Sequence, residues 1–457
     1  MSDLQTGNMN NVQLNLGEKK RYMAPPNTWR GVLTFIGPGA VLAALAVGGG
    51  ELVMNPRAGA MFGFALAWLV LMGLFFKYFI TSEIGRYPIV SGGNVLDSWA
   101  RMHPALPITF DIAALVARGV SVAGNGLTLG TILFWAFPNT ISHASWAILM
   151  TIVSGIILYI GLYNVLEKIS LVMVGIMIIA VVICAVAVMT AQTWGEFFTG
   201  LVSIGKIPSG SLKDALPLLG WSGEGAIGTI LYAAWLQERG HGIKVGNNVT
   251  KDTKLSEQEI KDGKSWLRVM KTDLSISFVI QGLACFAFMI AGAVILRPLG
   301  IVPEGSSLAT EQARLFTEVL GPWAQQLFIL GAAAAMFTTL MVAIDCETRI
   351  GQDLFKRLKK NVMQTEADRI KVYRGFLIFS VIITVIFSKV AAPLTLLKFG
   401  AVFDGVILLP IAGYLTYRAN KKFIPEALQS KGAWAAITLL GIGVLSIFAV
   451  LALVYLY

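Results

Sequence analysis

The sequence is poor in charged residues. Only 14% of its 457 residues are Asp, Glu, Lys or Arg, whereas a soluble domain carries about 25%. The apolar stretches that result run for about 20 residues, long enough to cross a bilayer core about 30 Å thick. Lipid cannot satisfy backbone amides and carbonyls, so such stretches must be helices. A soluble globular fold is therefore excluded, and an all-α polytopic membrane protein is predicted.

Paired cysteines and a cleavable leader are also missing. Cys184, Cys285 and Cys346 lie in or beside apolar segments without the spacing of a zinc site or a disulfide framework, and we interpret them as ordinary helix packing. Residues 1–29 lack the apolar core of a signal peptide, so none is expected. No nucleophile–base pair is evident, and no loop is long enough for a catalytic domain. We therefore expect no enzyme activity and no cofactor.

The net charge of +10 raises the question of an anionic partner such as nucleic acid. The Lys and Arg residues lie mostly in loops between apolar segments, as membrane topology requires. No basic domain with interleaved aromatic residues is present. The expected partners are therefore the lipid bilayer and a transported ion or small solute, and not nucleic acid.

Eleven membrane spans are predicted. Basic residues concentrate in the N-terminal tail, 1–30, and in the loops after the sixth, eighth and tenth spans, which share one side of the membrane. We therefore place the N-terminus in the cytoplasm and the C-terminus outside, in the plasma (inner) membrane. The predicted spans are 31–60, 64–87, 108–137, 142–162, 169–191, 215–236, 274–297, 323–345, 373–389, 393–418 and 432–456.

Two glycine clusters interrupt the first and sixth spans. Each glycine costs a helix about 1 kcal/mol relative to alanine, so both places favour unwinding. Unwound backbone at membrane depth is tolerated only where it faces protein or a water-filled cavity, and its carbonyls can bind ions there. Close helix packing is the alternative use of such glycines. The clusters are Gly48, Gly49 and Gly50 in span one, and Gly220, Gly223, Gly225 and Gly228 in span six.

Each interruption carries one carboxylate, Glu51 in span one and Glu224 in span six. An acid inside the membrane is costly and is a functional candidate by default. The two interruptions are five spans apart, which predicts two five-helix repeats, 31–191 and 215–418, followed by an additional helix, 432–457. Inverted repeats with discontinuous helices are typical of secondary transporters, so the predicted fold is a LeuT-like 5+5 inverted repeat plus an eleventh helix.

Several short motifs resemble the Nramp family of divalent-metal transporters. They are Gly37-Pro38-Gly39, the stretch from Arg57 to Gly63, Leu231-Tyr232 and Gly351-Gln352. The resemblance covers nearly the whole chain. It implies the eleven-helix form with a cytoplasmic N-terminus.

Departures from the family pattern fall on the metal motifs. The family's Asp-Pro-Gly-Asn motif falls on 48–51, so its aspartate is lost and its asparagine becomes Glu51; its Met-Pro-His motif falls near 227–229. Glu224 takes the place of a residue that offers only a backbone carbonyl. The acids of the third-helix proton route are replaced by Arg118 and Ser121. The family's substrate and coupling ion therefore do not carry over intact.

The residue types in the two interruptions favour a hard cation. Neither contains sulfur, and carboxylates with carbonyls suit Mg, Ca and Mn. Glu51 and Glu224 are the predicted metal ligands, and the exposed backbone supplies further oxygens. The predicted substrate site comprises Gly48, Gly49, Gly50, Glu51, Gly223, Glu224, Gly225 and Thr229.

Arg118, Asn125 and Asp404 are candidate coupling or cavity residues. Arg118 and Asp111 are two turns apart on one helix, so they either pair through neighbours or Arg118 faces the cavity, where it would favour an anionic substrate. Asn125 also suits an interhelical hydrogen bond.

Three other groups of charged side chains have simpler interpretations. Lys77 and Lys398 are expected to snorkel to an interface. Asp345 and Glu347 are expected to be solvated acids at the cytoplasmic mouth.

Two functions remain open on one fold. The first is transport of a divalent cation, Mg or Mn favoured, by alternating access. The second is Na⁺- or H⁺-coupled transport of a small organic solute, with the glutamates binding the coupling ion or an amine. A membrane receptor would require a sizeable signalling domain, which the sequence lacks.

Overall fold

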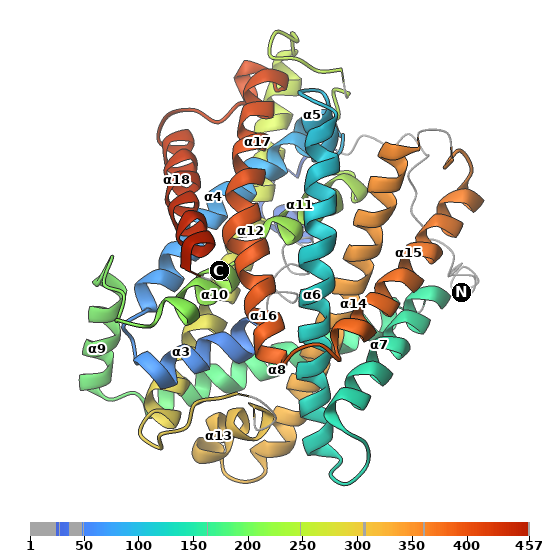
Figure 1. Cartoon of the computed structure of the whole chain (residues 1–457). Coiled ribbons are helices and arrows are strands. Elements are labelled where there is room, and N and C mark those ends of the chain that lie inside the picture. The colour runs from blue at the N-terminus through green and yellow to red at the C-terminus, as the bar shows by residue number, and fades with distance from the viewer. Residues whose placement is uncertain are drawn as a thin grey trace, which may run out of the picture.

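Helices account for nearly all of the regular structure in the computed structural model (Figure 1). The structure describes residues 24–26, 28–35, 48, 50–161, 163–246, 248–304, 308–359 and 362–455. Gly49 and the motif at 37–39 lie outside these residues.

The helices follow one another with few long connections. In chain order they are α1 (Trp29–Thr34), a π-helical turn (Gly50–Met54), α3 (Asn55–Phe62), α4 (Ala67–Ser91), α5 (Val95–Ala100), α6 (Ala105–Ala136), α7 (His143–Ile160), α8 (Tyr163–Val188), α9 (Ala191–Val202), α10 (Leu212–Trp221), α11 (Ala226–Glu238), α12 (Glu257–Ala291) with a π-helical end (Gly292–Leu296), α13 (Leu308–Leu320), α14 (Ala324–Leu358), α15 (Glu366–Phe387), α16 (Pro393–Val402), a π-helical turn (Phe403–Leu408), α17 (Leu409–Phe423) and α18 (Gly432–Tyr455).

Among the described residues, eight helical segments are long and apolar enough to cross a membrane. They coincide with the predicted second, third, fourth and seventh to eleventh spans. The predicted fifth span is α8, which meets α9 at an angle of 114°. The two halves of the interrupted sixth span, α10 and α11, are each too short to cross alone, as expected of a broken helix.

Besides the short α5, two further helices lie where the sequence predicted loops. α9 follows the sharp bend after α8, and α13 occupies the segment between the predicted seventh and eighth spans. Both are too short to span a bilayer. The side-chain amide of Gln312 on α13 donates to the backbone carbonyl of Leu52, so α13 is fixed by a tertiary contact that the sequence pattern does not reveal.

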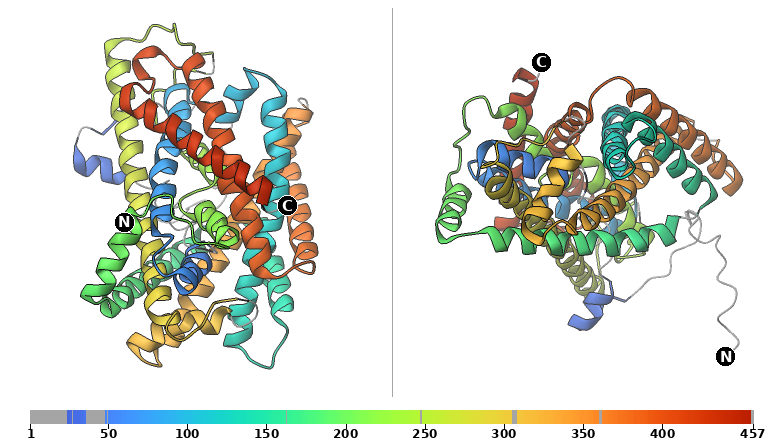
Figure 2. Two further views of the ribbon diagram at one scale, coloured as in Figure 1. Left: turned by 60° about the vertical axis from the view of Figure 1, so that its left-hand side comes forward. Right: turned by 90° about the horizontal axis from the view of Figure 1, so that it is seen from below.

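The bundle has an inner and an outer set of helices. About 70% of the apolar window of α4, α12 and α14 is buried, whereas only 22% of that of α7 and 17% of that of α15 is. The outer helices therefore present apolar side chains to lipid. α13 lies at one end of the molecule and α5 at the other (Figure 1). In the end-on view of Figure 2, α8 runs along one edge of the bundle.

Candidate functional site

The two helix interruptions meet inside the bundle. Gly50 opens the first π-helical turn and packs directly on Trp221, the last residue of α10. A Cβ atom added at Gly50 would lie 2.6 Å from the Cβ of Trp221, closer than real Cβ contacts, so a larger residue would push the two segments apart. The predicted juxtaposition of the breaks is therefore a feature of the fold.

Glu51 is completely buried in the first turn. Its Oε2 accepts from the backbone N–H of Gly48 at 3.4 Å, and its Oε1 faces the Sγ of Cys285 on α12 at 3.7 Å. Asn55 closes the turn by donating from Nδ2 to the Gly50 carbonyl at 3.4 Å. Cys285 packs in the apolar core, and α12 also brings its thiol against this carboxylate, which the sequence did not reveal.

The second break spans Ser222 to Gly225, between α10 and α11. Asp404, in the π-helical turn between α16 and α17, reaches into this break, and its Oδ1 accepts from the backbone N–H of Ile227 at 2.9 Å. A carboxylate there satisfies one of the unpaired amides that begin α11 and complements the helix dipole. Asp404, which the sequence singled out as a candidate cavity residue, thus lies at the second break.

Gly225 leaves room for the Asp404 carboxylate, whose Oδ2 occupies the position that a Cβ atom would need. We expect Gly225→Ala to displace Asp404 from α11 and to destabilise the protein by about 1–3 kcal/mol, the usual cost of overpacking. The measurement is the thermal midpoint of the purified protein. Gly175→Ala on α8 is the matched control, since nothing lies within 4 Å of its added Cβ. Equal midpoints for the two variants would contradict the prediction.

Glu224 lies in the second break and is partly exposed, but its Oε1 atom is buried and has no hydrogen-bond partner among the described residues. It is close enough to Arg118, Asp404 and Lys77 for electrostatic interaction. Glu51 is in turn within electrostatic range of Glu224. The structure therefore gathers three carboxylates around the two breaks.

Lys77 does not snorkel to an interface, contrary to the sequence-based expectation. Its side chain is fully buried, and its Nζ donates to the backbone carbonyls of Gly220 at 2.7 Å and Gly223 at 3.4 Å. The break in the sixth span supplies hydrogen-bond acceptors inside the bundle, so the ammonium turns inward. No spacing rule within α4 could have revealed these partners.

The Lys398 side chain is 23% exposed and its Nζ is paired with Asp214 on α10, so its snorkelling to an interface stays a prediction. Thr229 bonds the Thr81 hydroxyl at 3.2 Å and thereby ties α11 to α4. Asn125 is buried on α6, and its Oδ1 has no hydrogen-bond partner within the part of the chain that the structure describes.

Asp111 and Arg118 do not pair with each other. Arg118 Nη1 lies 3.9 Å from Asp404 Oδ2, whereas Asp111 Oδ2 lies 3.6 Å from the Nε of Arg357 on α14. Arg118 therefore faces the second break, which agrees with the alternative in which Arg118 faces the cavity. The sequence could not choose between them because the partners come from α14 and from the turn after α16.

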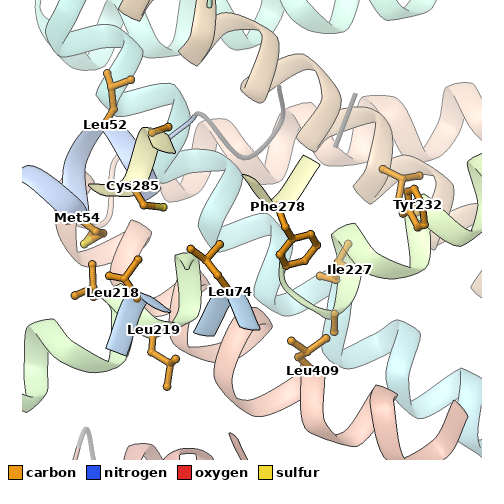
Figure 3. Close-up of a cluster of buried hydrophobic side chains, with 14 of the residues drawn as sticks. Leu52, Met54, Leu74, Leu218, Leu219, Ile227, Tyr232, Phe278, Cys285 and Leu409 are labelled. Atoms are coloured by element: carbon orange, nitrogen blue, oxygen red, sulfur yellow. The ribbon is translucent and has the colours of Figure 1, made fainter. Parts of the chain in front are cut away.

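Buried apolar side chains cluster beside the two breaks (Figure 3). Several belong to the broken segments themselves, and the rest come from α4, α12 and α17. Such walls exclude water and strengthen electrostatic interactions inside. The labelled cluster includes Leu52, Met54, Leu74, Leu218, Leu219, Ile227, Phe278 and Leu409.

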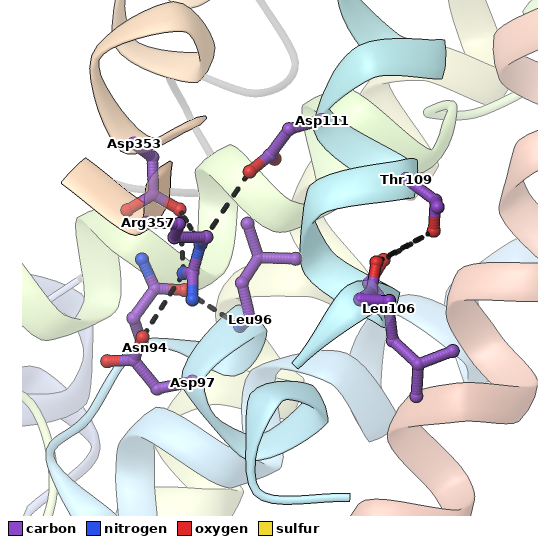
Figure 4. A network of polar contacts seen from close by, with 9 residues as sticks. Asn94, Leu96, Asp97, Leu106, Thr109, Asp111, Asp353 and Arg357 are labelled. Atoms are coloured by element: carbon purple, nitrogen blue, oxygen red, sulfur yellow. Dashed lines mark hydrogen bonds and ion pairs between the residues drawn. The ribbon is translucent and has the colours of Figure 1, made fainter. Parts of the chain in front are cut away.

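A cavity of about 380 Å³ extends from the second break toward the α5 end of the molecule. It begins at Ile227, whose amide holds Asp404, and its polar lining includes Asp97, Asp111 and Asp353. Arg357 connects these three carboxylates, at 3.1 Å from Asp97, 3.6 Å from Asp111 and 2.7 Å from Asp353 (Figure 4). The cavity thus has a charged mouth where α5, α6 and α14 meet.

The two acids that end the predicted eighth span differ from one another. Asp345 pairs with Arg349 at 2.8 Å and accepts from the Tyr373 hydroxyl. Glu347 was expected to be solvated, but it is only 1% exposed. Its Oε2 has no hydrogen-bond partner among the described residues. α14 extends well past the predicted span end to Leu358, so Glu347 lies within the helix rather than at its mouth.

The opposite end of the molecule is closed by ion pairs. Arg57 on α3 lies 3.1 Å from Asp214 on α10 and 3.0 Å from Glu304, and its guanidinium also donates to the Pro303 carbonyl at 2.9 Å. Lys398 on α16 shares the Asp214 carboxylate. We call Arg57, Asp214 and Lys398 the α3–α10 lock. The site is therefore sealed at the lock and approached through the cavity at the α5 end.

A metal ion would find carboxylates here but no ready-made cage. Within the described residues, no three His, Cys, Asp or Glu side chains converge in an arrangement that could hold a metal. The two predicted ligands, Glu51 and Glu224, lie within electrostatic range of each other, as do Glu224 and Asp404. Two cations, fully buried Lys77 and partly buried Arg118, also lie beside the second break.

Comparisons with known proteins give one consistent family. The family model described as natural resistance-associated macrophage protein-like, or Nramp, matches residues 39–456. An uncharacterized protein of Pasteurella multocida is 22% identical over 326 residues, 71% of each chain. The metal transporter Nramp3.1 of Populus trichocarpa is 23% identical, over 69% of this chain and 62% of its own length.

Solved structures agree on the fold. A manganese transporter of Eremococcus coleocola superposes with a TM-score of 0.70 at 14% identity, over 94% of this chain and 88% of that one. MhsT, solved with L-phenylalanine, superposes with a TM-score of 0.56 at 15% identity, over 94% and 99%. The architecture is therefore the LeuT-like one that the interrupted helices predicted.

Proposed function

The chain belongs to the Nramp family, and from that premise we propose that it is a secondary transporter that moves a divalent metal cation by alternating access. It is an integral membrane protein with the fold of transporters. The observation that carries the proposal is the meeting of two broken helices around buried Glu51 and adjacent Glu224. In this proposal, hard ions such as Mg²⁺ or Mn²⁺ are the favoured cargo, because oxygen ligands dominate the site.

Each of the candidate residues has a role in this proposal. Glu51 and Glu224 neutralise the cation, and Asp404 supplies a third carboxylate while holding the start of α11. Gly48, Gly50 and Gly225 offer backbone carbonyls that each already accept one hydrogen bond, from Leu52, Asn55 and Thr229. The carbonyl of Gly223 accepts from Lys77. Thr229 positions α11 through its bond to α4. Arg118 balances charge beside Asp404, and Asn125 remains a candidate lining residue.

Alternating access is supported by the unequal ends of the site. The cavity at the α5 end reaches Ile227, whereas the α3–α10 lock closes the other end. Basic loops at the α5 end favour a cytoplasmic position for it, which would make this an inward-facing state with the N-terminus inside. In this proposal, opening the lock and closing the cavity would turn the same site to the other side of the membrane.

Lys77 and Arg118 favour a second candidate function, transport of a small organic solute. These two cations beside the acids oppose a divalent cation by like-charge repulsion, but they suit a solute that carries both charges. The glycines of the breaks would then give room for a larger ligand. The cavity volume of about 380 Å³ is compatible with such a solute.

One panel experiment separates the two candidates. Thermal midpoints of the purified protein are measured with Mg²⁺, Mn²⁺, Ca²⁺ and a set of small zwitterionic and cationic metabolites, since a ligand of the folded state raises its stability. We expect saturable stabilisation by a hard divalent cation, about 2.7 kcal/mol at 100 times Kd. Stabilisation by organic solutes alone would reject the metal assignment and support the second candidate.

A further inference from the structure

The carbonyls freed by the break in the sixth span are already bound by an ammonium group. In a continuous helix the carbonyl of Gly220 would accept from the amide of residue 224. α10 ends at Trp221 instead, and Lys77 Nζ donates to Gly220 at 2.7 Å and to Gly223 at 3.4 Å. Lys77 lies on α4, a different helix, and is fully buried.

The fold is shaped to admit this side chain. Gly223 has a φ of +81°, which L side chains rarely adopt. A Cβ atom added there would lie 3.3 Å from Lys77 Cδ and 3.1 Å from Phe278 Cε1. A larger residue at 223 would therefore be strained and would press on the stem of Lys77. The close approach of the lysine to the broken helix depends on this glycine.

The surroundings suit a fixed positive charge. Lys77 is within electrostatic range of Asp404, Glu224 and Glu51. A buried ammonium is tolerated only with hydrogen bonds and opposite charge, and both are present. Freed main-chain carbonyls at a helix break are also the ligands with which transporters of this architecture hold monovalent coupling cations. The ammonium and an alkali cation would compete for the same two oxygens.

We propose that Lys77 is a tethered substitute for a coupling cation, so that the site takes its cargo without binding Na⁺ or K⁺ at the sixth-span break. The positive charge stays attached to α4 and does not cross the membrane with the cargo. Cargo transport would then be independent of a sodium gradient. The role of Lys77 as a substitute for a coupling cation rests on the proposed transport function. The hydrogen bonds between Lys77 and the two carbonyls do not depend on that function.

The experiment measures sodium binding directly. Full-length protein in lipid nanodiscs is titrated with NaCl against choline chloride, at constant ionic strength and pH, and the thermal midpoint is followed. We expect no saturable response from the wild type. Lys77→Met removes the ammonium but keeps the apolar stem, and should gain a saturable rise of about 1–2 °C at roughly ten times Kd. Lys398→Met, which removes a lysine of the α3–α10 lock, should gain none.

Each outcome decides the proposal. A saturable sodium or potassium response of the wild type overturns it, as does a Lys77→Met protein that folds and gains no response. Should Lys77→Met fail to fold, Lys77→Gln is titrated in the same way, and a folded variant without a gain likewise overturns it. The metal panel gives an independent result, so failure of metal binding with a sodium-insensitive wild type would reject the cargo while leaving the role of Lys77 supported.

Discussion

Glu51→Gln and Glu224→Gln should each lower the initial rate of divalent-cation uptake into proteoliposomes by about 100-fold or more. Each substitution keeps the side-chain shape but removes one negative charge near the proposed position of the cation. At an effective dielectric constant of about 20, two unit charges 4 Å apart interact by about 4 kcal/mol, and about 2.7 kcal/mol already corresponds to a factor of 100. Glu51 should have the larger effect because it is completely buried.

Two controls make this uptake experiment specific. Glu257→Gln, an exposed glutamate at the start of α12, should transport at the wild-type rate. Thermal midpoints should show that the Glu51 and Glu224 variants are folded, and removing an uncompensated buried charge can raise rather than lower stability. Unchanged uptake by both variants would remove these glutamates from the binding site and, with them, the central element of the proposed function.

Arg57→Gln should shift the protein toward the state that is open at the α3–α10 lock. The Arg57 side chain is 9% exposed and the Asp214 side chain 11% exposed. Breaking such a buried pair by removing one partner costs about 3–5 kcal/mol. If the pair exists only in the closed arrangement of this end, the equilibrium between the two states moves by a factor of about 100 or more.

Accessibility of an engineered cysteine next to the lock measures this shift. Alkylation by a membrane-impermeant maleimide at position 215, introduced as Ala215→Cys beside Asp214 where the side chain is buried, should be faster in the presence of Arg57→Gln than in its absence. Arg314→Gln is the matched control, since its ion pair with Glu318 is half exposed at both partners and contributes little. Equal alkylation rates in the Arg57 and Arg314 variants would show that the ion pair does not control access.

The breaks themselves could be found from the sequence because glycine weakens helices wherever it occurs. Gly50, Gly223 and Gly225 marked the breaks, and Glu51 and Glu224 stood out because acids are costly within apolar spans. The resemblance of the short motifs to the Nramp family was confirmed by a family match over 39–456. These signals depend on residues that are close together in the sequence, so they are visible without a structure.

The partners of the site could not be found in this way. Lys77, Cys285 and Asp404 come from α4, α12 and the turn after α16, and only their approach to the breaks reveals their surroundings. Lys77 and Cys285 were assigned ordinary roles because a lysine beside an apolar span usually snorkels and a lone cysteine usually packs. Asp111 and Arg118 were equally misleading, since two turns of one helix separated them while their true partners lay on other elements.

By itself, the sequence determined the membrane environment, most of the helical spans, the position of the break in the sixth span and the family. Hydrophobic length and glycine content act on each segment separately, so these properties can be deduced without coordinates. Only the tertiary structure decided which charges face one another, that Lys77 binds the carbonyls of the sixth-span break, and that one end is locked while the other is hollow. Those outcomes depend on distances between helices, and electrostatic energies change steeply with distance inside an apolar bundle.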